Sequence, residues 1–166
     1  VLKLMRPGDV ITHCFQGRGD NILDDKGRVI PDAWAARRDG VIFDVGHGAG
    51  SFRYEIAQRA MEQGFISDVI STDLHTGNIN GPVYDLPTTL SKFFDLGLSL
   101  EEVIEKSTIA AAKAIQRENE IGHLKIGGVA DVAVFSLIEG EFEFFDTHGT
   151  MVIGKKKLQA DLTIRE

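Results

Sequence analysis

Cysteine, proline and long apolar runs are scarce in this chain, and each scarcity excludes a class of protein. The single cysteine, Cys14, rules out an intrachain disulfide. No stretch approaches the roughly 20 apolar residues that cross a bilayer, and no signal peptide is recognisable. Acidic residues outnumber basic ones by 25 to 18, and the formal charge of −7 argues against binding to nucleic acid. We therefore expect a cytoplasmic protein with no membrane or nucleic-acid partner.

The remaining composition is that of an ordinary globular protein, with 43% hydrophobic residues in a chain of 166. The sequence enters structure almost at once: residues 2–6 resemble the tail of a helix, closed by Pro7 and Gly8. A natural domain rarely begins so abruptly. We expect the chain to be a fragment whose upstream part is absent.

Three β-branched apolar runs each end in a residue that can bind a metal or work beside one. The terminal residues are His13, His47 and Asp73. Such a run, followed by glycine and polar residues, predicts a buried strand that delivers its last side chain to the carboxyl end. A parallel β/α barrel builds its active site at the carboxyl ends of its strands. We therefore predict that the three side chains meet at one rim of a barrel.

Helical periodicity and capping signals occupy the segments between these runs. Ser51 is a predicted N-cap, and Ser99 with Glu102 forms a capping box. The long polar stretch after His13 has the character of an active-site loop. The predicted helices are residues 31–38, 51–63, 86–94 and 99–116. Near residue 122 the pattern changes to short strands separated by turns, which predicts a small β domain with strands at residues 130–135, 141–145 and 150–153.

Imidazole and carboxylate ligands suit zinc and similar divalent ions. Such a metal lowers the pKa of bound water to about 7, and a neighbouring carboxylate can take its proton and pass it to a leaving group. On this hypothesis His13 and His47 are metal ligands, and Asp73 is both a ligand and the catalytic general base. A lone histidine after an apolar run is more often a hydrogen-bonded core residue. The match between three strand ends favours the metal.

Further residues near these strand ends are candidates for contact with substrate. Gly48 lies in a Gly-His-Gly-Ala-Gly run, which either leaves room for a substrate or serves the geometry of a strand-to-helix turn. His75 could orient Asp73, contact substrate or be solvated. Asn78 and Tyr84 are loop residues that could reach substrate, although asparagine also favours turns.

The order Thr-His13-Cys-Phe, Asp-Val-Gly-His47-Gly, Ser-Thr-Asp73-Leu-His75 resembles the amidohydrolase superfamily, and more narrowly its dihydroorotase-like amidohydrolase/deacetylase group. The Gly-x-Leu-x-x-Gly-x-x-Ala-Asp pattern at residues 122–131 is similar too. The resemblance implies an α/β fold. Residues 1–121 would be the C-terminal half of a metal-dependent (β/α)8 TIM barrel, and residues 122–166 would be short strands of a small β-sandwich domain.

The resemblance also implies one or two divalent metals, zinc first among them. His13 and His47 then match the ligands of strands five and six, and Asp73 matches the aspartate of strand eight. Such proteins also carry a His-x-His pair and a bridging lysine, and no His-x-His occurs here, so the first half of the barrel would be missing. Only about 25 residues separate His47 from Asp73, so we expect an irregular or rearranged seventh strand.

These observations predict that the intact protein hydrolyses an amide or ester of a small molecule, as a deacetylase does, through metal-activated hydroxide. The alternatives are a cyclic amidohydrolase, like dihydroorotases and allantoinases, and a catalytically inert fragment. We expect the isolated chain to have little or no activity. A half-barrel would expose apolar faces, so we also expect packing against another copy or a complementary N-terminal fragment.

Overall fold

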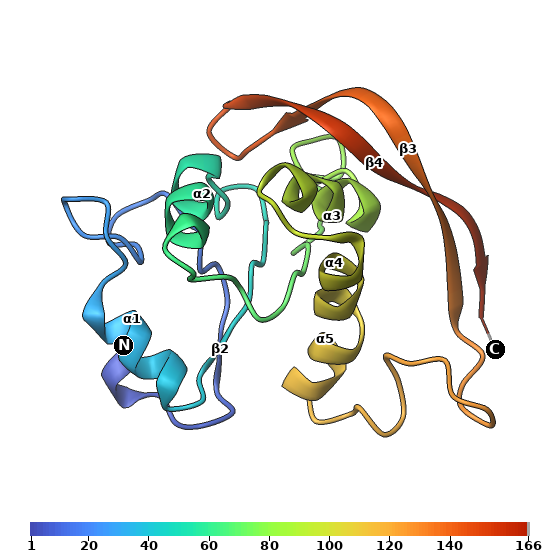
Figure 1. Cartoon of the computed structure of the whole chain (residues 1–166), viewed down its shortest axis with the longest axis horizontal. Helices are drawn as coiled ribbons and strands as arrows, with labels where there is room; N and C mark the ends of the chain where they lie inside the picture. Colours follow the sequence, from blue (N-terminus) through green and yellow to red (C-terminus); the bar gives the residue numbers. More distant parts are fainter. Residues whose placement is uncertain (166) are drawn as a thin grey trace.

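The computed structural model describes residues 1–165, which adopt an α/β fold with two separate small sheets (Figure 1). None of the described helices is both long and apolar enough to cross a membrane. The elements in chain order are η1 (Leu2–Leu4), β1 (Val10–Ile11), α1 (Pro31–Arg38), β2 (Ile42–Phe43), α2 (Tyr54–Glu62), α3 (Leu86–Asp95), α4 (Leu100–Ser107), α5 (Ile109–Ala114), β3 (Val132–Phe145) and β4 (Met151–Ile164).

The predicted site residues follow three neighbouring parallel segments. β1 pairs in parallel with β2, and Asp44, directly after β2, forms a parallel bridge to Val69. The nine-residue helix α2 lies in the connection between the second and third segments. The segment that ends at Asp73 is therefore the direct neighbour of the one that ends at His47. No regular strand lies between these two segments in the described part of the chain, and the irregular or rearranged seventh strand stays a prediction.

The helices follow the local signals closely at some ends and not at others. The capping box of Ser99 and Glu102 is present at the start of α4, and Asp85 caps α3 by accepting a hydrogen bond from the Thr88 N–H. The predicted N-cap Ser51 is wrong, because the N-cap of α2 is Arg53. The single helix predicted for residues 99–116 is also broken at Thr108, whose φ of −123° and ψ of −94° separate α4 from α5.

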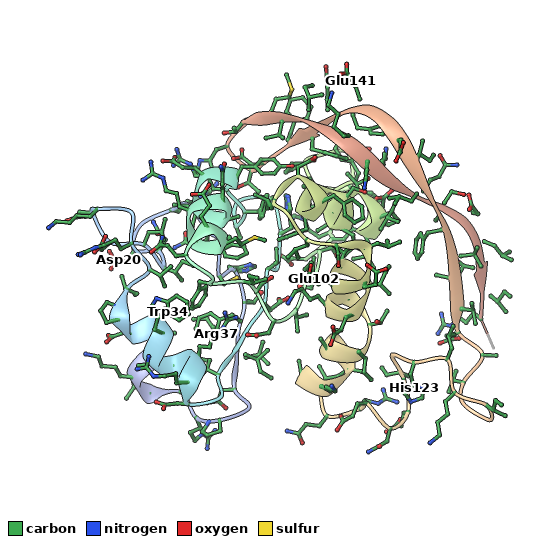
Figure 2. All side chains as sticks on the ribbon, in the orientation of Figure 1. Asp20, Trp34, Arg37, Glu102, His123 and Glu141 are labelled. Carbon is green, nitrogen blue, oxygen red and sulfur yellow. The ribbon has the colours of Figure 1, made fainter. Side chains whose placement is uncertain are left out.

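A core of aromatic side chains joins the helices to the parallel segments. Phe43 and Trp34 each meet the Phe65 ring edge to face, with centroids 4.9 and 5.1 Å away. The Arg37 guanidinium lies over the Phe65 ring at 4.3 Å and pairs with Asp68 at 3.1 Å. Figure 2 shows Trp34 and Arg37 extending from α1 toward this core. This aromatic core therefore supports β1 and β2.

The C-terminal part is a long hairpin in place of the three short strands predicted. β3 and β4 each span 14 residues and pair antiparallel, with a register shift between Glu139 and Phe142 that absorbs the expected turn near Gly140. The hairpin arches over α3 (Figure 1), where Leu158 is buried and its N–H donates to the Ser91 hydroxyl at 2.8 Å. The β-sandwich and the boundary near residue 122 remain predictions.

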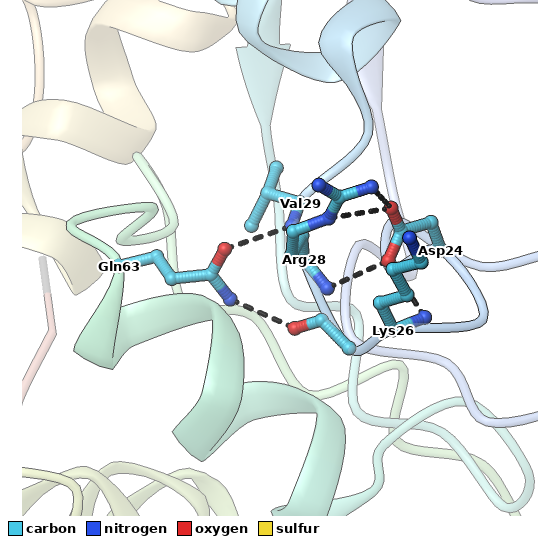
Figure 3. Close-up of polar contacts among 6 residues, drawn as sticks. Asp24, Lys26, Arg28, Val29 and Gln63 are labelled. Atoms are coloured by element: carbon cyan, nitrogen blue, oxygen red, sulfur yellow. Dashed lines mark hydrogen bonds and ion pairs between the residues drawn. The ribbon is translucent and has the colours of Figure 1, made fainter.

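The polar loop after His13 is held by its own side chains (Figure 3). The Asp24 carboxylate accepts hydrogen bonds from the Arg28 guanidinium at 2.7 and 2.9 Å, and these bonds lower the pKa of Asp24 to about 2. Gln63, just beyond α2, accepts a hydrogen bond from the Val29 N–H and donates one to the Gly27 carbonyl, both at 3.0 Å. This part of the loop therefore contacts the end of α2 that is remote from Gly48.

Candidate functional site

His13 and Asp73 lie on either side of a turn made by Gly46, His47 and Gly48. The His13 Nδ1 is 2.6 Å from the Gly46 carbonyl oxygen. A Cβ atom on Gly48 would stand 2.6 Å from the Asp73 Oδ2, so this carboxylate occupies the space that a side chain would take. Gly46 and Gly48 have φ values of +46° and +55°, which favour glycine. The glycines thus serve the turn geometry and also the close approach of Asp73.

The backbone of three predicted site residues is strained. Within residues 1–165, four residues other than glycine have positive φ, and His13 (63°), Asp73 (48°) and Tyr84 (63°) are three of them. A left-handed conformation is uncommon outside glycine, although histidine and aspartate tolerate it better than most residues. Such strain persists only where surrounding contacts impose it, and it clusters at functional sites. The geometry therefore marks His13 and Asp73 as functional candidates independently of their chemistry.

His47 is buried in the core. Its ring is fully buried and stacks on Phe52, with centroids 4.7 Å apart. Its Nδ1 is 3.0 Å from the Gly48 carbonyl oxygen, and its Nε2 is 2.7 Å from the Lys92 Nζ. Both ring nitrogens are therefore engaged within the described part of the chain, and the ligand role of His47 stays a prediction.

Lys92, on the buried face of α3, is a site residue that the sequence analysis missed. Its side chain is fully buried, and its ammonium donates to the His47 Nε2, to the Pro82 carbonyl at 2.8 Å and to the Phe145 carbonyl at 2.7 Å. A lysine ammonium has three donors, and all three have acceptors here. The signal in the sequence was a lysine flanked by uncharged side chains from Leu86 to Phe94.

Burial shapes the ionisation of this pair. Loss of water, and then the Lys92 charge, lower the pKa of His47 to about 3. Burial lowers the pKa of Lys92 to about 7, and the Asp146 carboxylate partly offsets the shift. At mildly acidic pH the His47 imidazole is neutral, and its Nε2 accepts a hydrogen bond from the charged Lys92 ammonium. The Nδ1–H of that tautomer then donates to the Gly48 carbonyl.

A second polar group missed in the sequence, Asp44, ties the three segments together. Its Oδ2 accepts hydrogen bonds from the Thr12 hydroxyl at 2.8 Å and the Ser71 hydroxyl at 2.7 Å. Its Oδ1 is buried without a hydrogen-bond partner in the described part of the chain. Asp44 borders a cleft of about 890 Å³, which we call the apolar cleft. The cleft is lined mainly by apolar side chains, among them Val10, Val69, Leu90, Ile104, Ile115, Val129 and Phe135.

The predicted substrate residues divide into exposed and structural ones. His75 is exposed, and its Nδ1 accepts a hydrogen bond from the Gly77 N–H at 3.0 Å. Tyr84 is 44% exposed. Asn78 is fully buried: its Oδ1 accepts from the His75 N–H at 2.8 Å, and its Nδ2 donates to the Asp73 carbonyl at 2.9 Å. Asn78 therefore makes the hydrogen bonds of a turn, and its contact with substrate stays a prediction.

The donors of this chain fit a divalent metal in kind and fall short in number. A histidine and an aspartate are ordinary zinc ligands. Among residues 1–165, however, no group of three or more His, Cys, Asp or Glu side chains could hold a metal ion. His13 and Asp73 alone therefore do not make a complete metal site.

This chain belongs to the amidohydrolase family, whose model matches residues 53–157, and specifically to its dihydroorotase-like group. It is 40% identical to a deacetylase of Enterococcus faecalis over 166 residues, which cover 99% of this chain and 45% of that protein. It is 39% identical to a deacetylase of Brucella anthropi over 150 residues, which cover 90% of this chain and 37% of that protein.

Solved structures are similar as well. The crystal structure of an adenine deaminase matches with a TM-score of 0.95 and 39% identity, over 99% of this chain and 45% of that one. The crystal structure of a dihydroorotase matches with a TM-score of 0.84 and 34% identity, over 99% of this chain and 42% of that one. The chain thus spans less than half the length of each of these four proteins.

Proposed function

We propose that this chain forms part of a hydrolase that cleaves an amide or ester bond in a small molecule, with deacetylation as the leading activity. The observation that carries the proposal is the pairing of His13 and Asp73 across one glycine turn, in strained backbone, in a member of the amidohydrolase family. The deacetylase relatives favour an acyl substrate.

In this proposal Asp73 transfers the proton and His13 is a metal ligand. Asp73 is exposed, so its carboxylate is free to meet water and substrate. When bound, a divalent ion, zinc being the first candidate, would supply water activated near neutral pH. The other ligands would come from the portion of the relatives that this chain does not match. His75 and Tyr84 are exposed near the same loop and would contact the substrate.

A chimera tests the proposal. This chain would be joined to the unmatched N-terminal part of the Enterococcus faecalis deacetylase and assayed with zinc on N-acetyl, O-acetyl and cyclic ureide compounds. We expect hydrolysis of an acetyl compound and a loss of about 10²- to 10⁴-fold in kcat/KM on Asp73→Asn, the range for a lost general base.

Asp85→Asn is the matched control, because asparagine caps a helix as well as aspartate does. It should keep the activity of the parent chimera. Preference for the cyclic ureide would instead support the dihydroorotase-like alternative, which the second solved structure favours. No zinc-dependent hydrolysis in a folded chimera would support the inert alternative.

A further inference from the structure

The Lys92 ammonium joins segments that are far apart in the sequence. Its three acceptors belong to the turn at His47, the loop at Pro82 and the end of β3 at Phe145. Burying a lysine is costly unless its charge is paired or hydrogen-bonded, and here all three donors have acceptors. Two of these segments lead directly to the candidate catalytic residues.

The first path runs from Lys92 to His13. The ammonium donates to the His47 Nε2 at 2.7 Å, and the buried imidazole is also stacked on Phe52. His47 is thereby fixed on two sides. The residue before it, Gly46, presents the carbonyl oxygen that lies 2.6 Å from the His13 Nδ1. A shift of His47 would move this carbonyl and the ring of His13 with it.

The second path runs from Lys92 to Asp73. The ammonium donates to the Pro82 carbonyl at 2.8 Å, and the preceding Gly81 donates its N–H to the Asn78 carbonyl at 3.1 Å. The Asn78 side chain in turn donates to the Asp73 carbonyl at 2.9 Å. The loop that holds Asp73 in its left-handed conformation is therefore anchored at the same ammonium.

We propose that Lys92 is a positioning residue, which sets the placement of His13 relative to Asp73 through His47 on one side and Pro82 on the other. Lys92 is fully buried, so it acts through these neighbours and touches no substrate. The chemistry that His13 and Asp73 perform rests on the proposed function, whereas their mechanical link to Lys92 does not. The hydrogen bond from Lys92 to the Phe145 carbonyl also connects the β3–β4 hairpin to this network.

Nitrogen NMR of the histidine rings tests the proposal on the 166-residue chain without metal. In Lys92→Met we expect the ring resonances of His13 to shift, although the two residues share no direct contact. Lys106→Met is the matched control, because the Lys106 Nζ donates to the Ser67 carbonyl at 2.7 Å, away from the glycine turn. It should leave His13 unchanged. Lys92→Arg, which keeps the charge and its donors, should restore much of the wild-type spectrum.

The wild-type spectrum supplies a test that does not depend on whether a variant folds. The proposal requires His47 to be the neutral Nδ1–H tautomer, with Nε2 free to accept from Lys92. The Nε2–H tautomer would overturn the first path. Unchanged His13 resonances in a folded Lys92→Met chain would overturn the proposal as a whole.

Zinc titration separates this inference from the proposed function. If zinc perturbs His13 in the wild type, Lys92→Met should weaken that binding by about tenfold or more, as loss of an outer partner does in metal sites. If zinc leaves His13 unaffected in the chimera, which restores the other ligands, the metal function fails. The metal-free spectra still decide the role of Lys92.

Discussion

At the scale of single residues, the site contains groups whose ordinary properties are changed by their surroundings. His47 and Lys92 lie side by side in the core, where burial lowers the pKa of each. His13 is half-buried and Asp73 is exposed, and the backbone of both is held in a conformation that glycine prefers. Burial of charge therefore destabilises the folded chain at His47 and Lys92, and left-handed backbone destabilises it at His13 and Asp73.

The buried ammonium makes stability depend on pH. The pKa of Lys92 is about 7 in the folded chain and near 10.5 in the unfolded one. Between these values the unfolded state binds more protons, so the free energy of unfolding should rise as the pH is raised from 7. One proton contributes at most about 1.4 kcal/mol per pH unit. Urea unfolding at pH 7.0–8.5 should show this slope, and Lys92→Met should flatten it.

The pH range ends at 8.5 because other buried groups lower the free energy of unfolding at higher pH. Burial raises the pKa of Cys14 and of Tyr54, so both hold their protons longer in the folded chain and lower stability at higher pH. Lys106→Met should keep the wild-type slope. An equal slope in Lys92→Met and the wild type would contradict the prediction.

At the scale of elements, the β3–β4 hairpin depends on the helix beneath it. An isolated two-stranded hairpin is marginally stable in water at best. Here Leu158 and Phe144 are each 2% exposed against the core, and the Ser91 hydroxyl of α3 accepts the Leu158 N–H. α3 therefore carries both Ser91, which binds the hairpin, and Lys92. The packing of the hairpin and the geometry of the site thus depend on the same helix.

Leu158→Ala should lower the free energy of unfolding by about 2–5 kcal/mol, because it empties a packed position in the core. The matched control is Leu162→Ala on the same strand, where the side chain is 53% exposed. It should change stability by no more than about 0.5 kcal/mol. Urea unfolding followed by circular dichroism measures both. Similar losses for the two variants would mean that the hairpin is not anchored at Leu158.

How far the sequence predicts these features depends on how local their causes are. The capping box at Ser99 and the strand before His13 follow from neighbouring residues, and both are present. The run before Asp73 forms only an isolated parallel bridge, at Val69. The direction of His47 was not foreseeable from alternation along a strand, because the flanking glycines leave extended backbone. Lys92 was missed because two of its three acceptors are backbone carbonyls, which have no signature in the sequence.

At the scale of the whole molecule, a large apolar surface lies open. The apolar cleft is lined by residues of α3, α4, α5 and the start of β3. The segment after α5, which carries His123 in Figure 2, runs along it. Ile115 is 60% exposed, and Leu124 on the linker is 82% exposed. Exposed apolar patches of this kind mark interaction surfaces.

In the isolated chain, the surface available to cover the cleft is that of a second copy. We therefore expect light scattering after size exclusion to give a mass above the 18.2 kDa of one chain, rising with concentration. Ile115→Asp should shift the population toward monomer. Leu4→Asp is the control, because Leu4 is 86% exposed and lies outside the cleft. A monodisperse monomer at all concentrations would contradict the prediction.

The left-handed backbone at His13, Asp73 and Tyr84 has an evolutionary consequence. Glycine at any of these positions would relax the main chain, so lineages selected only for heat resistance should drift toward glycine there. Lineages selected for turnover should keep the original side chains and tolerate the lower melting temperature. The identity of these three residues in a collection of variants would therefore record which pressure had acted.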